Sequence, residues 1–236
     1  MYTLGHDESV GRAEVEMKGK LLIVFKSVHG YVKRYVDILG NALGCDAVPV
    51  DKLRAEMFVG YDKILFIGPV RGANIFGFKK MNDYLDIIYD KLAVCGVGML
   101  PFRKEIADRL KDGSVSVAYE KFVPVFYVQS GFDINELSRT EKVSISMLVR
   151  QIKMSSTVSD LDTVILDAVN TPFDNVKQEN IQPLIDYLDG KTVDESLYSP
   201  PEITDPEERK KFFEDLEKAA AAPENKKRAL KKKLKK

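Results

Sequence analysis

Short runs of consecutive apolar residues alternate along the chain with segments whose apolar residues recur every three or four positions. The short runs predict β-strands that are buried on both faces. They cover residues 20–25, 47–50, 63–67, 92–97 and 122–128. The longer period predicts helices, at residues 31–43, 75–92 and 181–188. This alternation favours right-handed crossovers, and it predicts an α/β fold with a doubly wound parallel sheet.

The five strands fit the order 2-1-3-4-5, in which the first strand lies between the second and the third. Pro124 falls inside the fifth predicted strand. Because proline lacks the N–H that a sheet ladder needs, this strand is expected at an edge, as the order requires. Ligands of such sheets bind beyond the carboxyl ends of the strands, near the point where the strand order reverses.

Composition divides the chain into three predicted parts. They are a polar leader (1–19), a globular domain (20–190) with an insertion at about residues 129–170, and a linker with a charged helical tail (191–236). Within the tail, Asp205 is expected as the N-cap and Pro206 as the first residue of a helix that ends before Pro223.

A net charge of zero conceals an acidic body and a basic tail. Residues 226–236 hold eight Lys or Arg and no acid, so the rest of the chain carries a net charge of −8. An acidic body argues against nucleic-acid binding by the globular part. The tail is open to two interpretations, contact with nucleic acid or anionic lipid and simple solubilisation.

Few residues are available for metal or thiol chemistry. The chain has two cysteines and two histidines, none in a ligand pair, so a zinc site and a disulfide scaffold are excluded. Its N-terminal residues lack the apolar core of a secretory signal, and no run approaches the roughly 18 apolar residues of a membrane span. We therefore expect a cytoplasmic protein, with peripheral membrane contact as an alternative.

Three loops are predicted to meet at the carboxyl edge of the sheet. The first joins a buried strand to a helix N-terminus, where free backbone N–H groups and the helix dipole suit a phosphate. The other two contain glycines that let backbone amides approach a planar ring. Candidate cofactor-binding residues are Ser27, Val28, His29, Gly30, Tyr31 and Val32 in the first loop, and Gly68, Pro69, Val70, Arg71, Gly96, Val97, Gly98 and Met99 in the others.

Ordinary strand-to-helix turns remain an alternative interpretation of each loop. The first loop contains neither a Walker A motif nor a G-x-G-x-x-G fingerprint. A phosphorylated receiver domain, which shares the strand order, needs acidic residues after strands one and three. The chain has Lys26 and Ser27 after the first strand and Gly68 and Pro69 after the third, which excludes that class.

The first loop resembles the aromatic-x-Ser-x-aromatic-Gly pattern of the flavodoxin superfamily, through Phe25, Ser27, His29 and Gly30. A longer pattern is most similar to the group that includes the menaquinone-dependent protoporphyrinogen IX dehydrogenases. This pattern comprises residues 126–128, 131–133, Leu137, Lys142, 147–148, 173–174 and 183–187. The resemblance extends over about residues 21–188.

The resemblance implies a non-covalently bound FMN and an oxidoreductase or electron-transfer function. The phosphate would lie on the backbone of residues 27–32 and the Ser27 hydroxyl, and the isoalloxazine ring between residues 68–71 and 96–99. A small-molecule or protein redox partner is implied, with a quinone or a protoporphyrinogen-type compound as the candidate substrate. No catalytic side chain is identified.

Two positions depart from the family pattern. The family has hydroxyl residues just after the loop glycine, where this chain has Tyr31 and Val32. Because a hydrogen bond to a charged group contributes about 1.5–3 kcal/mol, losing two would weaken phosphate binding substantially. The alternative function is therefore a degenerate flavodoxin-fold binding or regulatory module that has lost FMN.

Residues 139–154 combine four basic residues with apolar ones that include Val143, Ile145, Met147, Leu148 and Ile152 in a predicted helix. One interpretation is contact with a quinone or a membrane surface. The other is a helix that packs on the body while its basic side chains reach into the solvent.

Overall fold

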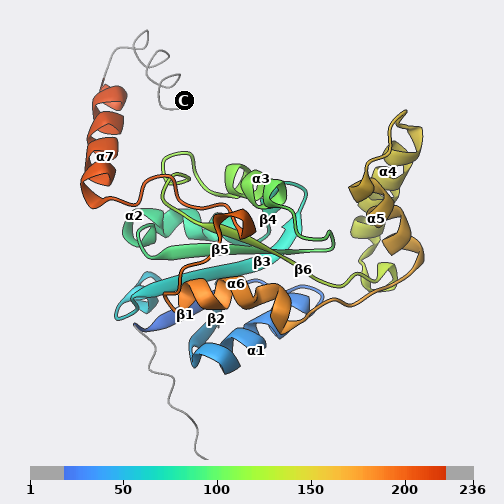
Figure 1. Ribbon diagram of the computed structural model, residues 1–236, viewed down its shortest axis with the longest axis horizontal. Coiled ribbons are helices and arrows are strands. Elements are labelled where there is room, and N and C mark those ends of the chain that lie inside the picture. Colours follow the sequence, from blue (N-terminus) through green and yellow to red (C-terminus); the bar gives the residue numbers. More distant parts are fainter. Residues whose placement is uncertain (1–18, 222–236) are drawn as a thin grey trace, which may run out of the picture.

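A central parallel sheet lies between two layers of helices in the computed structural model, which describes residues 19–221 (Figure 1). The strands β1 (Leu21–Phe25), β2 (Asp46–Pro49), β3 (Lys63–Arg71), β5 (Leu92–Gly98) and β6 (Val125–Gln129) follow the order β2-β1-β3-β5-β6. All of these neighbours pair in parallel. The predicted order 2-1-3-4-5 is confirmed, and the fold is flavodoxin-like.

Each face of the sheet buries its own apolar cluster. On one face α1 (Tyr31–Leu43) and α6 (Gln178–Leu188) contribute side chains such as Tyr35 and Leu184. On the other face lie α3 (Lys104–Ser114), the single-turn helix α2 (Leu85–Ile88) and the 3₁₀ segments Val50–Lys52, Ala55–Phe58 and Phe78–Tyr84. Burial on both faces explains why the strands contain unbroken apolar runs.

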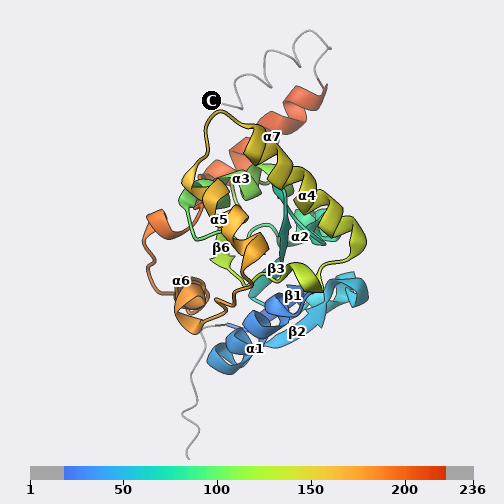
Figure 2. The ribbon, with the colours of Figure 1, turned by 90° about the vertical axis from the view of Figure 1, so that its right-hand side faces the viewer.

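Residues 131–173 form an arm that leaves the body at the carboxyl end of β6 (Figures 1 and 2). It contains a 3₁₀ turn (Ile134–Glu136) and the helices α4 (Arg139–Met154) and α5 (Asp160–Asn170). Each of the two helices begins with a capping box, from Ser138 and from Ser159. At its base the arm is closed by two backbone hydrogen bonds of 2.8 and 3.0 Å between Phe132 and Phe173.

The chain returns to the body after α6. A 3₁₀ turn (Glu195–Leu197) precedes Ser199, which pairs antiparallel with Val125 on the outer edge of β6. The last helix, α7 (Pro206–Ala221), begins as predicted, because Asp205 Oδ1 accepts hydrogen bonds from the N–H groups of the second and third helical residues. It packs through Phe212 and Phe213 against Phe122. Residues 1–18 and 222–236, which include most of the predicted leader and the basic end of the tail, lie outside the described residues.

The structure corrects four secondary-structure predictions. Pro124 precedes the fifth strand rather than lying inside it, although that strand is an edge of the parallel sheet. β3 continues to Arg71 and turns back through β4 (Asn74–Ile75). The predicted helix at residues 75–92 is a 3₁₀ segment followed by one α-helical turn. The helices α3 and α5 were not predicted.

Among residues 19–221, none of the helices has the length and apolar character that a membrane span requires.

Candidate functional site

The loop between β1 and α1 presents an open helix N-terminus at the carboxyl edge of the sheet. Gly30 is the N-cap of α1 with φ of +85°, and no side chain caps the helix there. An added Cβ would meet no atom within 4 Å, so the backbone conformation rather than a steric limit favours glycine. The first N–H groups of α1 therefore keep their hydrogen-bonding capacity, which suits an anion.

Side chains of this first loop differ in where they point. Ser27 and His29 are half-buried, and the hydroxyl of Ser27 forms no hydrogen bond within residues 19–221. Val28 is exposed. By contrast, Val32 is only 2% exposed and belongs to the core cluster beneath α1. The side chain at position 32 therefore packs on the sheet.

Tyr31 supports the base of the arm. A Cβ added at Gly131 would lie 2.6 Å from the Tyr31 ring and 2.6 Å from the Phe173 carbonyl, so glycine is required for this close packing. Arg34, one turn further along α1, pairs with Asp174 on the other side of the arm's base. Burial, and then the nearby carboxylates of Glu136, Asp174 and Asp133, raise the pKa of Tyr31. The aromatic ring at this position thus serves the docking of the arm.

The second loop is a hairpin at the end of β3. Pro69 and Val70 are half-buried, and Arg71 is exposed at the tip. The Arg71 guanidinium lies over the Phe76 ring, 4.0 Å from its centroid. At Gly68 an added Cβ would lie 2.7 Å from the Phe76 carbonyl oxygen. Close packing within the hairpin accounts for this glycine.

The third loop is held by side chains from β6. The Tyr127 hydroxyl donates a 2.7 Å hydrogen bond to the Leu100 carbonyl, and Gln129 Nε2 donates a 3.1 Å bond to the Met99 carbonyl. Gly96 and Val97 are buried in β5, while Gly98 and Met99 are half-buried. Contacts with Leu110 and Tyr127 leave no room for a Cβ at Gly96 or Gly98. The structure thus brings all three loops to one edge but covers several of the predicted positions with protein atoms.

Glu141 of α4 joins the first two loops. Its Oε1 atom accepts a 2.8 Å hydrogen bond from Arg71 and lies 3.2 Å from His29 Nε2. Hydrogen bonds from the hydroxyl and backbone N–H of Ser138, and a smaller contribution from His29, lower the pKa of Glu141 to about 2. Glu141 was not among the predicted site residues. The sequence S-R-T-E at residues 138–141, which is a capping-box pattern, would have placed it at a helix start but not at this edge.

A second acid of the arm reaches the third loop. Asp160 Oδ2, at the start of α5, lies 3.5 Å from Arg103. Since the Asp160 side chain is 92% exposed, this pair contributes little to stability. Even so, the arm places a carboxylate close to each of the three loops.

The two thiols are not activated, although Cys95 directly precedes Gly96 of the third loop. Burial raises the pKa of Cys95, which is fully buried in β5, and raises the pKa of Cys45 to about 11. Both groups therefore stay protonated near neutral pH. Within the described part of the chain, no three His, Cys, Asp or Glu side chains form a metal-binding group.

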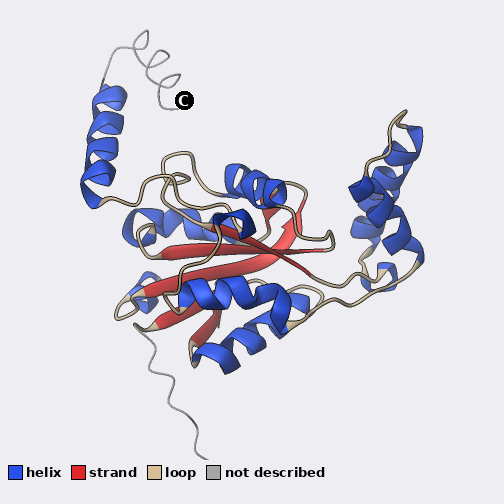
Figure 3. Cartoon of the chain, in the orientation of Figure 1, coloured by secondary structure: helices blue, strands red, loops and turns tan. Residues whose placement is uncertain are grey.

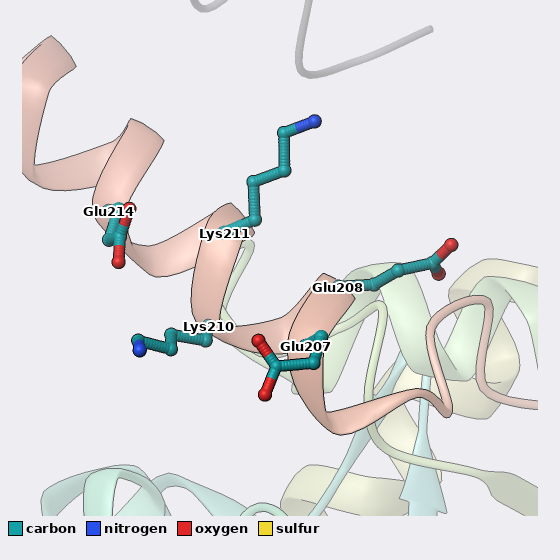
Figure 4. A pocket seen from close by; sticks show the side chains of 5 residues that line it. All are labelled: Glu207, Glu208, Lys210, Lys211 and Glu214. Carbon is teal, nitrogen blue, oxygen red and sulfur yellow. The ribbon is translucent and has the colours of Figure 1, made fainter.

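Two hollows lie on the surface. One, of about 210 Å³, follows the outer edge of β6 between α6 and the third loop, with Phe102, Tyr127, Pro183 and Leu197 among its lining residues. The other is a shallow depression whose lining side chains all come from α7 (Figure 4), namely Glu207, Glu208, Lys210, Lys211 and Glu214. Their charged ends point outward from a single helix, so this depression encloses no site.

Comparisons with known proteins identify one family model. The model described as flavodoxin domain matches residues 22–160. No curated protein gives a match. Among solved structures, a flavodoxin from the domain Archaea is 13% identical with a TM-score of 0.32, covering 54% of this chain and 95% of that one. A flavodiiron core (Flv1) from Synechocystis sp. is 12% identical with a TM-score of 0.33, covering 47% of this chain and 30% of that one.

Proposed function

The chain belongs to the flavodoxin-domain family, and from this premise we propose that it binds FMN non-covalently at the carboxyl edge of its sheet and acts in electron transfer. The observation that supports this most directly is the uncapped start of α1 beside Ser27, at the point where the strand order reverses. Open N–H groups at a helix N-terminus are the feature that a phosphate monoester requires.

The phosphate end of FMN fits the residues that are present. The backbone from Ser27 to Val32 and the free Ser27 hydroxyl would hold the phosphate oxygens. A Cβ added at Gly30 would meet no heavy atom within 4 Å apart from its chain neighbours, so this side of the turn is open to an anion. His29 and Arg71 supply donors at the mouth of the loop.

The ring would be held between the second and third loops. Val70 and Met99 are half-buried there and provide apolar surface, and the Met99 backbone is fixed by Gln129. Bound FMN supplies reversible uptake of electrons, while the protein positions and shields it. The protonated thiols Cys45 and Cys95 take no part.

The substrate side of the proposal follows from the resemblance to the protoporphyrinogen dehydrogenase group. Electrons would pass between a quinone or protein donor and a protoporphyrinogen-type compound. The arm, which lies beside the proposed ring position, is the segment that would contact such a substrate.

A second candidate, a binding or regulatory module without flavin, is supported by Glu141. Its carboxylate already provides an anion for both His29 and Arg71. A carboxylate that satisfies these donors competes with a phosphate for them, as expected of a loop that no longer serves a cofactor.

Spectra of the purified full-length protein separate the two candidates. A flavoprotein absorbs visible light and releases FMN on denaturation. If the preparation is colourless, titration with FMN, FAD and riboflavin identifies the preferred flavin, because riboflavin lacks the phosphate that the first loop would bind. If micromolar protein quenches the fluorescence of none of the three flavins, the result supports the module without flavin.

A further inference from the structure

The outer face of α4 exposes large apolar side chains that nothing in the described part of the chain covers. Val143, Met147 and Met154 are 57%, 69% and 75% exposed. α4 buries only Ile152, which lies on the opposite side of the helix, and the arm's second helix packs against α4. The interpretation in which this helix packs on the body is therefore wrong for its outer face.

These residues form one stripe with basic borders. Spacings of four and seven place Val143, Met147 and Met154 on the same side of a helix. The same spacing brings Arg139 and Arg150 beside them. Glu141 is the single acid in α4, and its carboxylate is turned toward the loops by Arg71. We call this stripe of five residues the outer face of α4.

We propose that the outer face of α4 docks on the surface of an anionic lipid bilayer. Apolar side chains on one side of a helix, bordered by arginines, match a helix that lies in the interface between headgroups and acyl chains. The arginines would extend toward the lipid phosphates while their stems stay in apolar surroundings. Because the arm projects from the body, this face can reach a flat surface (Figures 1 and 2).

The charge of α4 indicates which kind of surface its outer face binds. α4 carries four basic residues and one acid, so a neutral surface would leave the charges without partners. Each basic residue near an anionic leaflet strengthens binding by roughly fivefold. This proposal does not depend on FMN, so it can fail or succeed independently of the proposed function.

The absence of tryptophan from the chain allows a direct test. Met147→Trp places the chain's single tryptophan, which can be excited selectively, on the outer face of α4. With phosphatidylcholine vesicles that contain 30% phosphatidylglycerol, its emission should shift to the blue and be quenched by brominated acyl chains. Pure phosphatidylcholine should leave the emission nearly unchanged.

Val117→Trp is the matched control. Val117 is 58% exposed on the body, close to Tyr119, which contacts Phe213 of α7. Its emission should not change with either vesicle. If this probe shifts and the Met147 probe does not, the C-terminal region carries the binding, and the proposal fails.

Co-sedimentation with the same vesicles then measures how much the arginines and the apolar side chains each contribute to vesicle binding. Arg139→Gln with Arg150→Gln should weaken partitioning roughly 25-fold, and Met147→Ser with Met154→Ser at least tenfold. Val117→Ser should have no effect, and circular dichroism should show that every variant remains folded. Unchanged partitioning of either double variant, or binding that is equal on neutral and anionic vesicles, would overturn the proposal.

Discussion

Glu141 Oε1 lies 3.2 Å from His29 Nε2, although 112 residues separate them in the sequence. The same oxygen accepts a hydrogen bond from Arg71. One carboxylate of the arm thus connects the loop proposed to hold a phosphate with the loop proposed to hold a ring. The start of α4 is therefore positioned to influence any anion that approaches this edge of the sheet.

Replacing Glu141 with glutamine should strengthen FMN binding about tenfold. The change removes a negative charge and frees Arg71, and a hydrogen bond to a charged group contributes about 1.5–3 kcal/mol. Glutamine also preserves the capping box, so α4 should remain intact. Quenching of FMN fluorescence measures the affinity. Asp160→Asn, the other acid with which the arm reaches a loop, is the control and should change it less than twofold; weaker binding by Glu141→Gln would contradict the idea.

The same variant should alter the dependence of stability on pH. The pKa of Glu141 is lowered from 4.5 to about 2, so the folded state favours its charged form. Its contribution is therefore present above about pH 4.5 and is lost as the pH falls toward 2. The difference in Tm between wild type and Glu141→Gln should shrink as the pH falls from about 4.5 and be lost below about pH 2. A difference that is independent of pH would show that the carboxylate is not responsible.

The sheet could be predicted from the sequence because β1, β3, β5 and β6 are buried on both faces and contain unbroken apolar runs. Helix α3 could not be predicted, because it buries only Ala107, Leu110 and Lys111 and its remaining residues are mostly charged. The predicted helix at residues 75–92 had the right buried residues, including Phe78 and Met81. Spacings of three and four suit a 3₁₀ segment as well as an α-helix, so the pattern did not distinguish them.

The candidate site was predictable only in part. The convergence of the loops follows from strand order alone. The contacts of Glu141 depend on how the arm docks, which no local pattern encodes. Likewise, the sequence alone indicates that Tyr31 replaces a phosphate-binding hydroxyl residue of the family, whereas the structure shows its ring packed against Gly131.

Gly30→Ala should destabilise the protein by about 1–2 kcal/mol, because an L-residue with φ of +85° is strained. Gly40→Ala, in the interior of α1, should instead stabilise it by about 0.5–1 kcal/mol. Neither added Cβ meets an atom within 4 Å, so the two variants differ only in backbone conformation. Urea unfolding measures both. Equal effects would show that the turn at residue 30 is not as described.

Val32→Thr restores a family hydroxyl without changing side-chain shape. Because Val32 is 2% exposed, burying the hydroxyl should cost about 1–3 kcal/mol without ligand. At the second residue of α1 that hydroxyl is near the proposed phosphate, so FMN affinity should rise about tenfold. Val36 is also buried, one turn further along α1, and Val36→Thr is the control. It should lower stability in urea unfolding by a similar amount but leave the affinity for FMN unchanged. Equal affinities for the two variants would mean that the phosphate does not bind at the start of α1.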